Sequence, residues 1–137
     1  MPKKQDRIII DTNLWISFLL TSDYTKLDTI FAYKLITLVF SQELLNEFVA
    51  VAQRPKFKKY FSSSDLQELI LKVRERAVFI EVQSFVSICR DHKDNFLLAL
   101  AKDSKATHLI TGDKDLLELK VFNKTKVLTI TDYLESK

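Results

Sequence analysis

A short apolar run near the N-terminus, Arg7-Ile8-Ile9-Ile10, stops abruptly at Asp11-Thr12-Asn13. Its β-branched residues do not alternate with polar ones, which is typical of a strand buried on both faces. A strand of this kind belongs to a parallel sheet that has helices packed on both sides. The run therefore predicts an α/β fold in which this segment is a buried strand.

The rest of the chain alternates between strand-like runs and stretches with the spacing of helices. Further strands are predicted at residues 35–40, 78–82, 108–111 and 126–129. Helices are predicted at residues 14–20, 26–34, 41–52, 62–76, 94–104 and 113–119, with a last short helix capped by Thr131. Pro55 is expected to end or kink the helix before it. Because parallel strands need crossover connections, this order predicts one parallel sheet covered on both faces, in a single domain over residues 1–137.

The composition excludes several classes of protein. Although 47% of the 137 residues are hydrophobic, no apolar run approaches the roughly 18 residues of a membrane span, so we expect no membrane segment. Only three apolar residues separate the basic residues 1–7 from Asp11, so we expect no signal peptide and a cytoplasmic location. The single cysteine excludes an internal disulfide and a cysteine-rich zinc site, and the single glycine excludes the P-loop and the dinucleotide-binding fingerprint. The net charge of +3 is compatible with a polyanionic partner but is weak support for one.

Two aspartates directly follow predicted strands. Asp11 comes after the first strand, and Asp113 follows Thr111-Gly112 at the end of a later one. Open parallel sheets bind ligands beyond the carboxyl ends of their strands, so both aspartates are candidates for a site. Gly112 can supply the unusual backbone angle needed for a tight turn into the next helix. Taken alone, Asp11 is explained equally well as the cap of the helix that follows it.

Two further carboxylates project toward the apolar faces of predicted helices. Glu47 lies about 40° from Val51 in helical projection, and Asp94 is in line with residues that face the core. Taken alone, Glu47 is explained as a boundary residue paired with a lysine or arginine, and Asp94 as a favourable charge at a helix N-terminus. Asp91 and Asp115 are candidate additional ligands, although solvated charges explain them as well.

Carboxylates that converge without positive partners repel one another, which raises their pKa values and destabilises the fold unless a cation neutralises them. Ligation by oxygen alone suits Mg²⁺ or Mn²⁺ better than zinc, and leaves room for a substrate phosphate. Neither His92 nor His108 has a partner at metal-ligand spacing, so both are interpreted as structural. These acids together therefore indicate a metal site suited to phosphodiester hydrolysis.

Four segments of the sequence together resemble the PIN-domain family. They are Asp11-Thr12-Asn13, Glu47 within residues 41–48, Asp94 within residues 90–95, and Thr111-Gly112-Asp113, and their order and spacing cover nearly the whole chain. Among PIN domains the chain looks most like a small prokaryotic branch described as toxin components of toxin–antitoxin systems, related to VapC-type ribonucleases. Arg54-Pro55-Lys56-Phe57 fits that branch, whereas His92 stands where the branch often has proline.

The resemblance implies a PIN-like three-layer α/β/α sandwich with a central parallel sheet of about five strands, and cleavage of single-stranded RNA. It implies that Mg²⁺ or Mn²⁺ is held by Asp11, Glu47, Asp94 and Asp113, with Asn13 and Thr111 as supporting groups. The partners it implies are RNA, a cognate antitoxin protein and a second copy of the chain in a homodimer. Two alternatives stay open. One is a non-catalytic PIN-fold module that binds RNA or an antitoxin. The other is an aspartate-based phosphatase, which usually has a second aspartate where this chain has Asn13.

The segment at residues 54–61, Arg-Pro-Lys-Phe-Lys-Lys-Tyr-Phe, combines basic and aromatic side chains. Basic groups bind phosphates and aromatic rings stack on bases, so we interpret four residues as candidates for RNA binding: Arg54, Lys56, Lys58 and Lys59. The segment begins seven residues after Glu47, so it can border the site. A connector with buried rings and solvated lysines explains it equally well.

Overall fold

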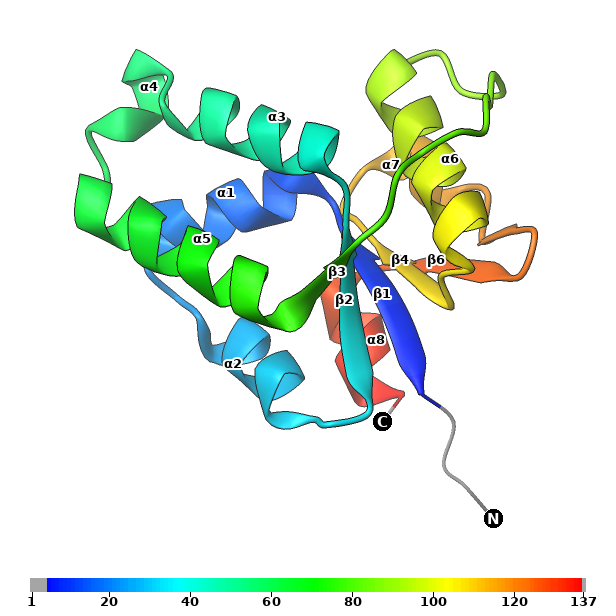
Figure 1. The fold of residues 1–137 in the computed structure, drawn as a ribbon, viewed down its shortest axis with the longest axis horizontal. Helices are drawn as coiled ribbons and strands as arrows, with labels where there is room; N and C mark the ends of the chain where they lie inside the picture. The colour runs from blue at the N-terminus through cyan, green and yellow to red at the C-terminus, as the bar shows by residue number, and fades with distance from the viewer. Residues whose placement is uncertain (1–4, 137) are drawn as a thin grey trace.

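The computed structural model describes residues 5–136, and Figure 1 shows its ribbon. Residues 1–4 and 137 lie outside this range, and they include part of the segment for which we expect no signal peptide and both ends of the predicted domain. None of the helices in residues 5–136 combines the length and the apolar character that a membrane span needs.

A sheet of six strands forms the centre of the described part of the chain, in the order β3-β2-β1-β4-β6-β5. The strands are β1 (Asp6–Ile10), β2 (Ile36–Phe40), β3 (Ala77–Phe79), β4 (His108–Ile110), β5 (Val121–Phe122) and β6 (Thr125–Leu128). Neighbours from β3 to β6 are parallel, and β5 pairs antiparallel with β6. Ile8, Ile9 and Ile10 are at most 1% exposed because β1 lies inside the sheet, which confirms the predicted buried strand.

Helices cover both faces of this sheet, which confirms the predicted three-layer α/β/α sandwich. In Figure 1, α1 to α5 gather on one side of the sheet and α6 lies on the other. The helices are α1 (Thr12–Thr21), α2 (Thr25–Ala32), α3 (Gln42–Ala52), α4 (Pro55–Lys58), α5 (Ser63–Arg76), α6 (His92–Ser104), α7 (Lys114–Leu117) and α8 (Ile130–Glu135).

The core fixes α1 and α3 against the ends of the central strands. Trp15 of α1 is fully buried, and its ring centroid lies 5.6 Å from that of Phe40 in β2 and 6.2 Å from that of Phe48 in α3. The indole N–H of Trp15 donates a hydrogen bond of 3.1 Å to the carbonyl of Ile10, the last residue of β1. A buried indole needs such a partner, so this contact sets the angle at which the chain leaves the strand.

The helix before Pro55 ends as expected, because α3 stops at Ala52, and Pro55 is itself the first residue of α4, where its missing N–H is not needed. The cap of the last helix differs from the expected one. Thr129 rather than Thr131 caps α8, because its hydroxyl accepts the backbone N–H of Asp132. The difference arises because two threonines close together can each serve as the helix cap.

The single glycine does not take the unusual backbone conformation that we expected of it. No glycine in the described residues has a positive φ, and the residues that do are Ser22, Lys105, Lys120 and Asn123. The turn after β4 is stabilised instead by Thr111, whose hydroxyl oxygen accepts the N–H of Asp113 at 3.0 Å. Asn123 lies in the β5–β6 hairpin, which the sequence did not indicate because a strand of two residues has no periodic pattern.

Candidate active site

Asp11 and Asp113 meet at one edge of the sheet because they follow β1 and β4, which are neighbouring parallel strands. The N–H of Asp11 donates to the carbonyl of Ile110 at 2.9 Å, so the ladder between these strands continues as far as the first acid. Asp11 is 7% exposed and Asp113 is half-buried. The two carboxylates therefore lie where open parallel sheets bind their ligands.

Thr111 connects the two aspartates through its hydroxyl group. The hydroxyl donates to Asp11 Oδ2 at 2.8 Å and accepts the N–H of Asp113, and the side chain is 1% exposed. Each aspartate also caps a helix: Asp11 Oδ1 accepts the N–H of Asn13 in α1, and Asp113 Oδ1 accepts two N–H groups of α7. Capping of a helix and a place in the site are therefore compatible roles for the same carboxylate.

Helices α3 and α6 bring two more carboxylates to this edge of the sheet. Glu47 lies between Leu44 and Val51 along α3, and all three residues line the same cavity, as expected for the edge of the apolar face. Asp94 lies in the first turn of α6 and is 5% exposed. The four candidate acids thus come from four separate elements of the fold.

The candidate ligands Asp91 and Asp115 have different surroundings. α6 begins at His92 rather than at Asp94 as expected, because Asp91 caps it by accepting the N–H of Lys93 at 2.8 Å. Asp91 is exposed but lines the cavity, whereas Asp115 forms an exposed ion pair of 3.2 Å with an arginine and is outside the lining. The helix start was misplaced because either aspartate of the loop can act as a cap.

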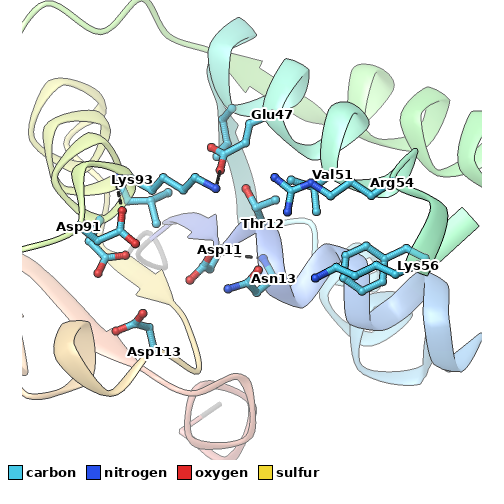
Figure 2. Close-up of a pocket in the computed structure, with 14 residues that line it drawn as sticks. Asp11, Thr12, Asn13, Glu47, Val51, Arg54, Lys56, Asp91, Lys93 and Asp113 are labelled. Carbon is cyan, nitrogen blue, oxygen red and sulfur yellow. Dashed lines mark hydrogen bonds and ion pairs between the residues drawn. The ribbon is translucent and has the colours of Figure 1, made fainter.

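These carboxylates line one cavity of about 220 Å³, shown in Figure 2. The lining residues are Asp11, Thr12, Asn13, Leu44, Glu47, Val51, Arg54, Lys56, Phe57, Asp91, Lys93, Asp94, Leu97 and Asp113. In Figure 2 the labelled acids surround one part of the cavity, and Arg54 and Lys56 lie at the other end. A cavity with an acidic part and a basic part can hold a cation and a phosphate next to each other.

Burial and repulsion between the acids change their proton affinities. Burial raises the pKa of Asp94 to about 6, and the charges of Asp113 and other nearby aspartates add to the increase. Burial also raises the pKa of Asp11, although hydrogen bonds from Thr111 and Asn13 oppose the increase. A divalent cation between these carboxylates would favour their charged forms, and their oxygen atoms are the donors that Mg²⁺ and Mn²⁺ prefer.

Lys93 is the cavity residue that the sequence analysis missed. Its Nζ lies 3.2 Å from Glu47 Oε1, and Figure 2 shows its side chain reaching from α6 across the cavity toward α3. No local signal indicates this pair, because the two residues belong to different helices and Lys93 stands in a run of mixed charges.

Within residues 5–136, no three Asp, Glu, His or Cys side chains are close enough to hold one metal ion as they stand. The acids fit a divalent ion by the chemistry of their oxygen atoms. Glu47 already forms an ion pair with the ammonium group of Lys93.

The basic segment is divided between two surfaces. Arg54 and Lys56 line the acidic cavity. Lys58 lines a separate groove beside α3 and α5, and the ammonium of Lys59 lies 5.3 Å from the ring centroid of Tyr60. Of the four basic residues considered for RNA binding, two therefore border the carboxylates directly.

Comparison with known proteins identifies the fold family. A family model described as "PIN domain" matches residues 7–115, a range that contains the four acids from Asp11 to Asp113. The chain is also similar to "Uncharacterized protein MJ1680" of Methanocaldococcus jannaschii, with 33% identity over 128 residues that cover 90% of this chain and 81% of the relative. No solved structure gives a significant match. The chain therefore belongs to the PIN-domain family.

Proposed function

We propose that this chain is a metal-dependent endoribonuclease that hydrolyses phosphodiester bonds of single-stranded RNA. The PIN domain has a nuclease-type fold whose members are commonly metal-dependent ribonucleases. The observation that carries the proposal is the meeting of four carboxylates from separate elements in a cavity with a basic end. Such a cluster is costly to the folded state unless it binds a cation.

The proposal gives each group in the cavity a role. The four ligands of Mg²⁺ or Mn²⁺ are Asp11, Glu47, Asp94 and Asp113. A bound ion of this kind activates water and stabilises negative charge on the phosphate. Thr111 orients the Asp11 carboxylate through their 2.8 Å hydrogen bond, and Asn13 supports it from the cavity wall. Arg54 and Lys56 hold the RNA backbone beside the acids.

A role as the toxin component of a toxin–antitoxin pair is part of the same proposal. It is supported by the likeness of Arg54-Pro55-Lys56-Phe57 to the toxin branch, a segment that forms most of α4 and borders the cavity. An antitoxin and a second copy of the chain are the protein partners that this role implies. A non-catalytic PIN module is the alternative, and it gives the four acids no chemical task.

Removal of the metal is the direct test of this function. We expect purified protein to cleave end-labelled single-stranded RNA in Mn²⁺ or Mg²⁺, to lose all cleavage in EDTA, and to regain it with excess Mn²⁺. Duplex RNA of the same sequence serves as the substrate control and should be cleaved far more slowly. Cleavage that persists in EDTA contradicts the metal mechanism, and RNA binding without cleavage in any metal favours the non-catalytic alternative.

Neutralising Lys56 should weaken the binding of RNA to the metal-free protein. We expect Lys56→Ala to weaken binding of single-stranded RNA in EDTA by roughly three- to tenfold and to reduce the salt dependence of log affinity by about 0.7, because one phosphate contact is lost. The matched control is Lys59→Ala, which lies in the same segment but outside the cavity lining. It should change the RNA affinity by less than about twofold, as expected for an exposed surface charge. Fluorescence anisotropy over a range of salt concentrations measures both. Equal effects of the two substitutions would show that the cavity end of the segment has no special part in binding.

A further inference from the structure

The ion pair between Lys93 and Glu47 connects two helices across the candidate site. Lys93 Nζ lies 3.2 Å from Glu47 Oε1, and the Glu47 side chain is 29% exposed. The backbone of Lys93 is held in place because its N–H donates to Asp91 Oδ1 at 2.8 Å. Figure 2 shows the lysine side chain above Asp11, on the route from α6 to α3. The Lys93 side chain is 58% exposed, so its ammonium group lies at the open side of the cavity with Glu47 as its partner.

Helix stability does not explain a lysine at this position. Lys93 is in the first turn of α6, where the helix dipole disfavours a positive charge. The ion pair between Arg90 and Asp115, by contrast, has side chains 89% and 47% exposed and lies outside the cavity. Lys93 instead pairs with a cavity carboxylate whose side chain is 29% exposed, where an opposite charge is screened less by solvent. The cavity, rather than the helix, accounts for the lysine.

A metal ion and this ammonium group compete for the same carboxylate. Glu47 Oε1 carries the contact with Lys93, and a divalent ion at that oxygen would bring two positive centres within a few ångströms of each other. A divalent ion that binds Oε1 therefore displaces the ammonium group, and one that binds the other oxygen of Glu47 is repelled by it. Anything that holds the metal-free arrangement reduces the apparent affinity for the metal by the same free energy.

We propose that Lys93 is a built-in counter-ion of the acidic cavity, which competes with divalent metal for Glu47 and so sets how tightly the metal is held. The inference rests on the proposed function, because it assumes that the four acids bind the ion. In metal-free protein Lys93 compensates the acids, and in the loaded protein it releases Glu47. Lys93 is thus a positioning residue that acts through Glu47.

Titration calorimetry with Mn²⁺ alone, without RNA, tests this competition. We expect Lys93→Met to bind Mn²⁺ roughly three- to tenfold more tightly than the wild type, since methionine replaces the unbranched apolar stem of lysine and removes the competing charge. The matched control is Lys102→Met in the last turn of the same helix and outside the cavity lining, which should leave the affinity within about twofold. Lys93 is exposed, so its substitution should leave the fold intact, as circular dichroism will show.

A double-mutant cycle with Glu47→Gln shows whether the effect passes through the ion pair. On the Glu47→Gln background, Lys93→Met should lose most of its gain in Mn²⁺ affinity, because the carboxylate that pairs with Lys93 is already gone. The inference is overturned if Lys93→Met does not tighten binding, or if its gain is as large without Glu47. Failure of both the wild type and Lys93→Met to bind Mn²⁺ overturns the proposed function as well. A wild type that binds Mn²⁺ with an affinity that Lys93→Met leaves unchanged overturns the inference alone.

Discussion

Asparagine in place of Asp11 is expected to lower Mn²⁺-dependent RNA cleavage by at least about a hundredfold while the protein stays folded. The fold should persist because asparagine caps helices as well as aspartate does. Its amide oxygen can still accept a hydrogen bond from Thr111 or from the N–H of Asn13. The substitution therefore removes the negative charge between β1 and β4 and little else. Single-turnover cleavage of labelled RNA, with circular dichroism on the same sample, measures both expectations.

Asp115→Asn is the matched control for this experiment. Asp115 is also an aspartate near the carboxyl edge, but it is 47% exposed, pairs with Arg90 and lies outside the cavity lining. We expect its substitution to change the cleavage rate by less than about threefold, as for an exposed ion pair. Full activity in Asp11→Asn would remove the central ligand from the proposed site. If the chain acts as a toxin, growth arrest on expression should disappear with Asp11→Asn and persist with Asp115→Asn.

Asp94→Asn is expected to stabilise the metal-free protein by on the order of 2–3 kcal/mol at pH 8. Burial and neighbouring acids raise the pKa of Asp94 from 3.8 to about 6, so its ionisation disfavours the folded state. This cost is absent below about pH 4, develops as the pH rises through about 6, and then stays constant. Asparagine removes it. The favourable effect of a charge in the first turn of α6 is also lost, but it amounts to only about 0.3–1 kcal/mol.

Urea unfolding in EDTA at pH 8 and pH 4.5 measures this gain, which should be several times larger at pH 8. Asp103→Asn is a control on the same helix with the opposite sign. Hydrogen bonds from the hydroxyl and N–H of Ser84 and the N–H of Gln83 lower the pKa of Asp103, so its charge stabilises the folded state. Asp103→Asn should therefore destabilise the protein at pH 8, and less so as the pH falls. An Asp94→Asn variant that is no more stable than the wild type at pH 8 would show that burial and the neighbouring acids do not disfavour the charged form of Asp94.

Every described strand except β5, and the shared sheet edge of Asp11 and Asp113, could be predicted from the sequence because they depend on local patterns. The β-branched run before Asp11 indicates a buried strand, and a parallel sheet brings the residues after β1 and β4 to the same edge. Helical projection likewise placed Glu47 beside the apolar stripe of α3. These inferences need only periodicity and the rule that parallel strands share an edge.

Features that depend on the packing of distant elements could not be predicted. The contact of Lys93 with Glu47 follows from the spacing between α6 and α3, which no local pattern encodes. The role expected of Gly112 was taken by Thr111, since a buried hydroxyl can stabilise the turn without an unusual φ. The helix caps at Asp91 and Thr129 were missed because several polar residues stood near each helix start.

The pairing of β1 with β4 determines when the cavity can form as the chain is synthesised. Asp11 and Thr111, which share a hydrogen bond, are 100 positions apart in the chain, and Ile8 pairs with His108. Contacts of such long range form slowly, because a large loop must close first. A nascent chain that already carries Asp11, Glu47 and Asp94 still lacks the strand that completes their surroundings. An unfinished polypeptide therefore has no assembled cavity until Thr111 and the strand before it have been made.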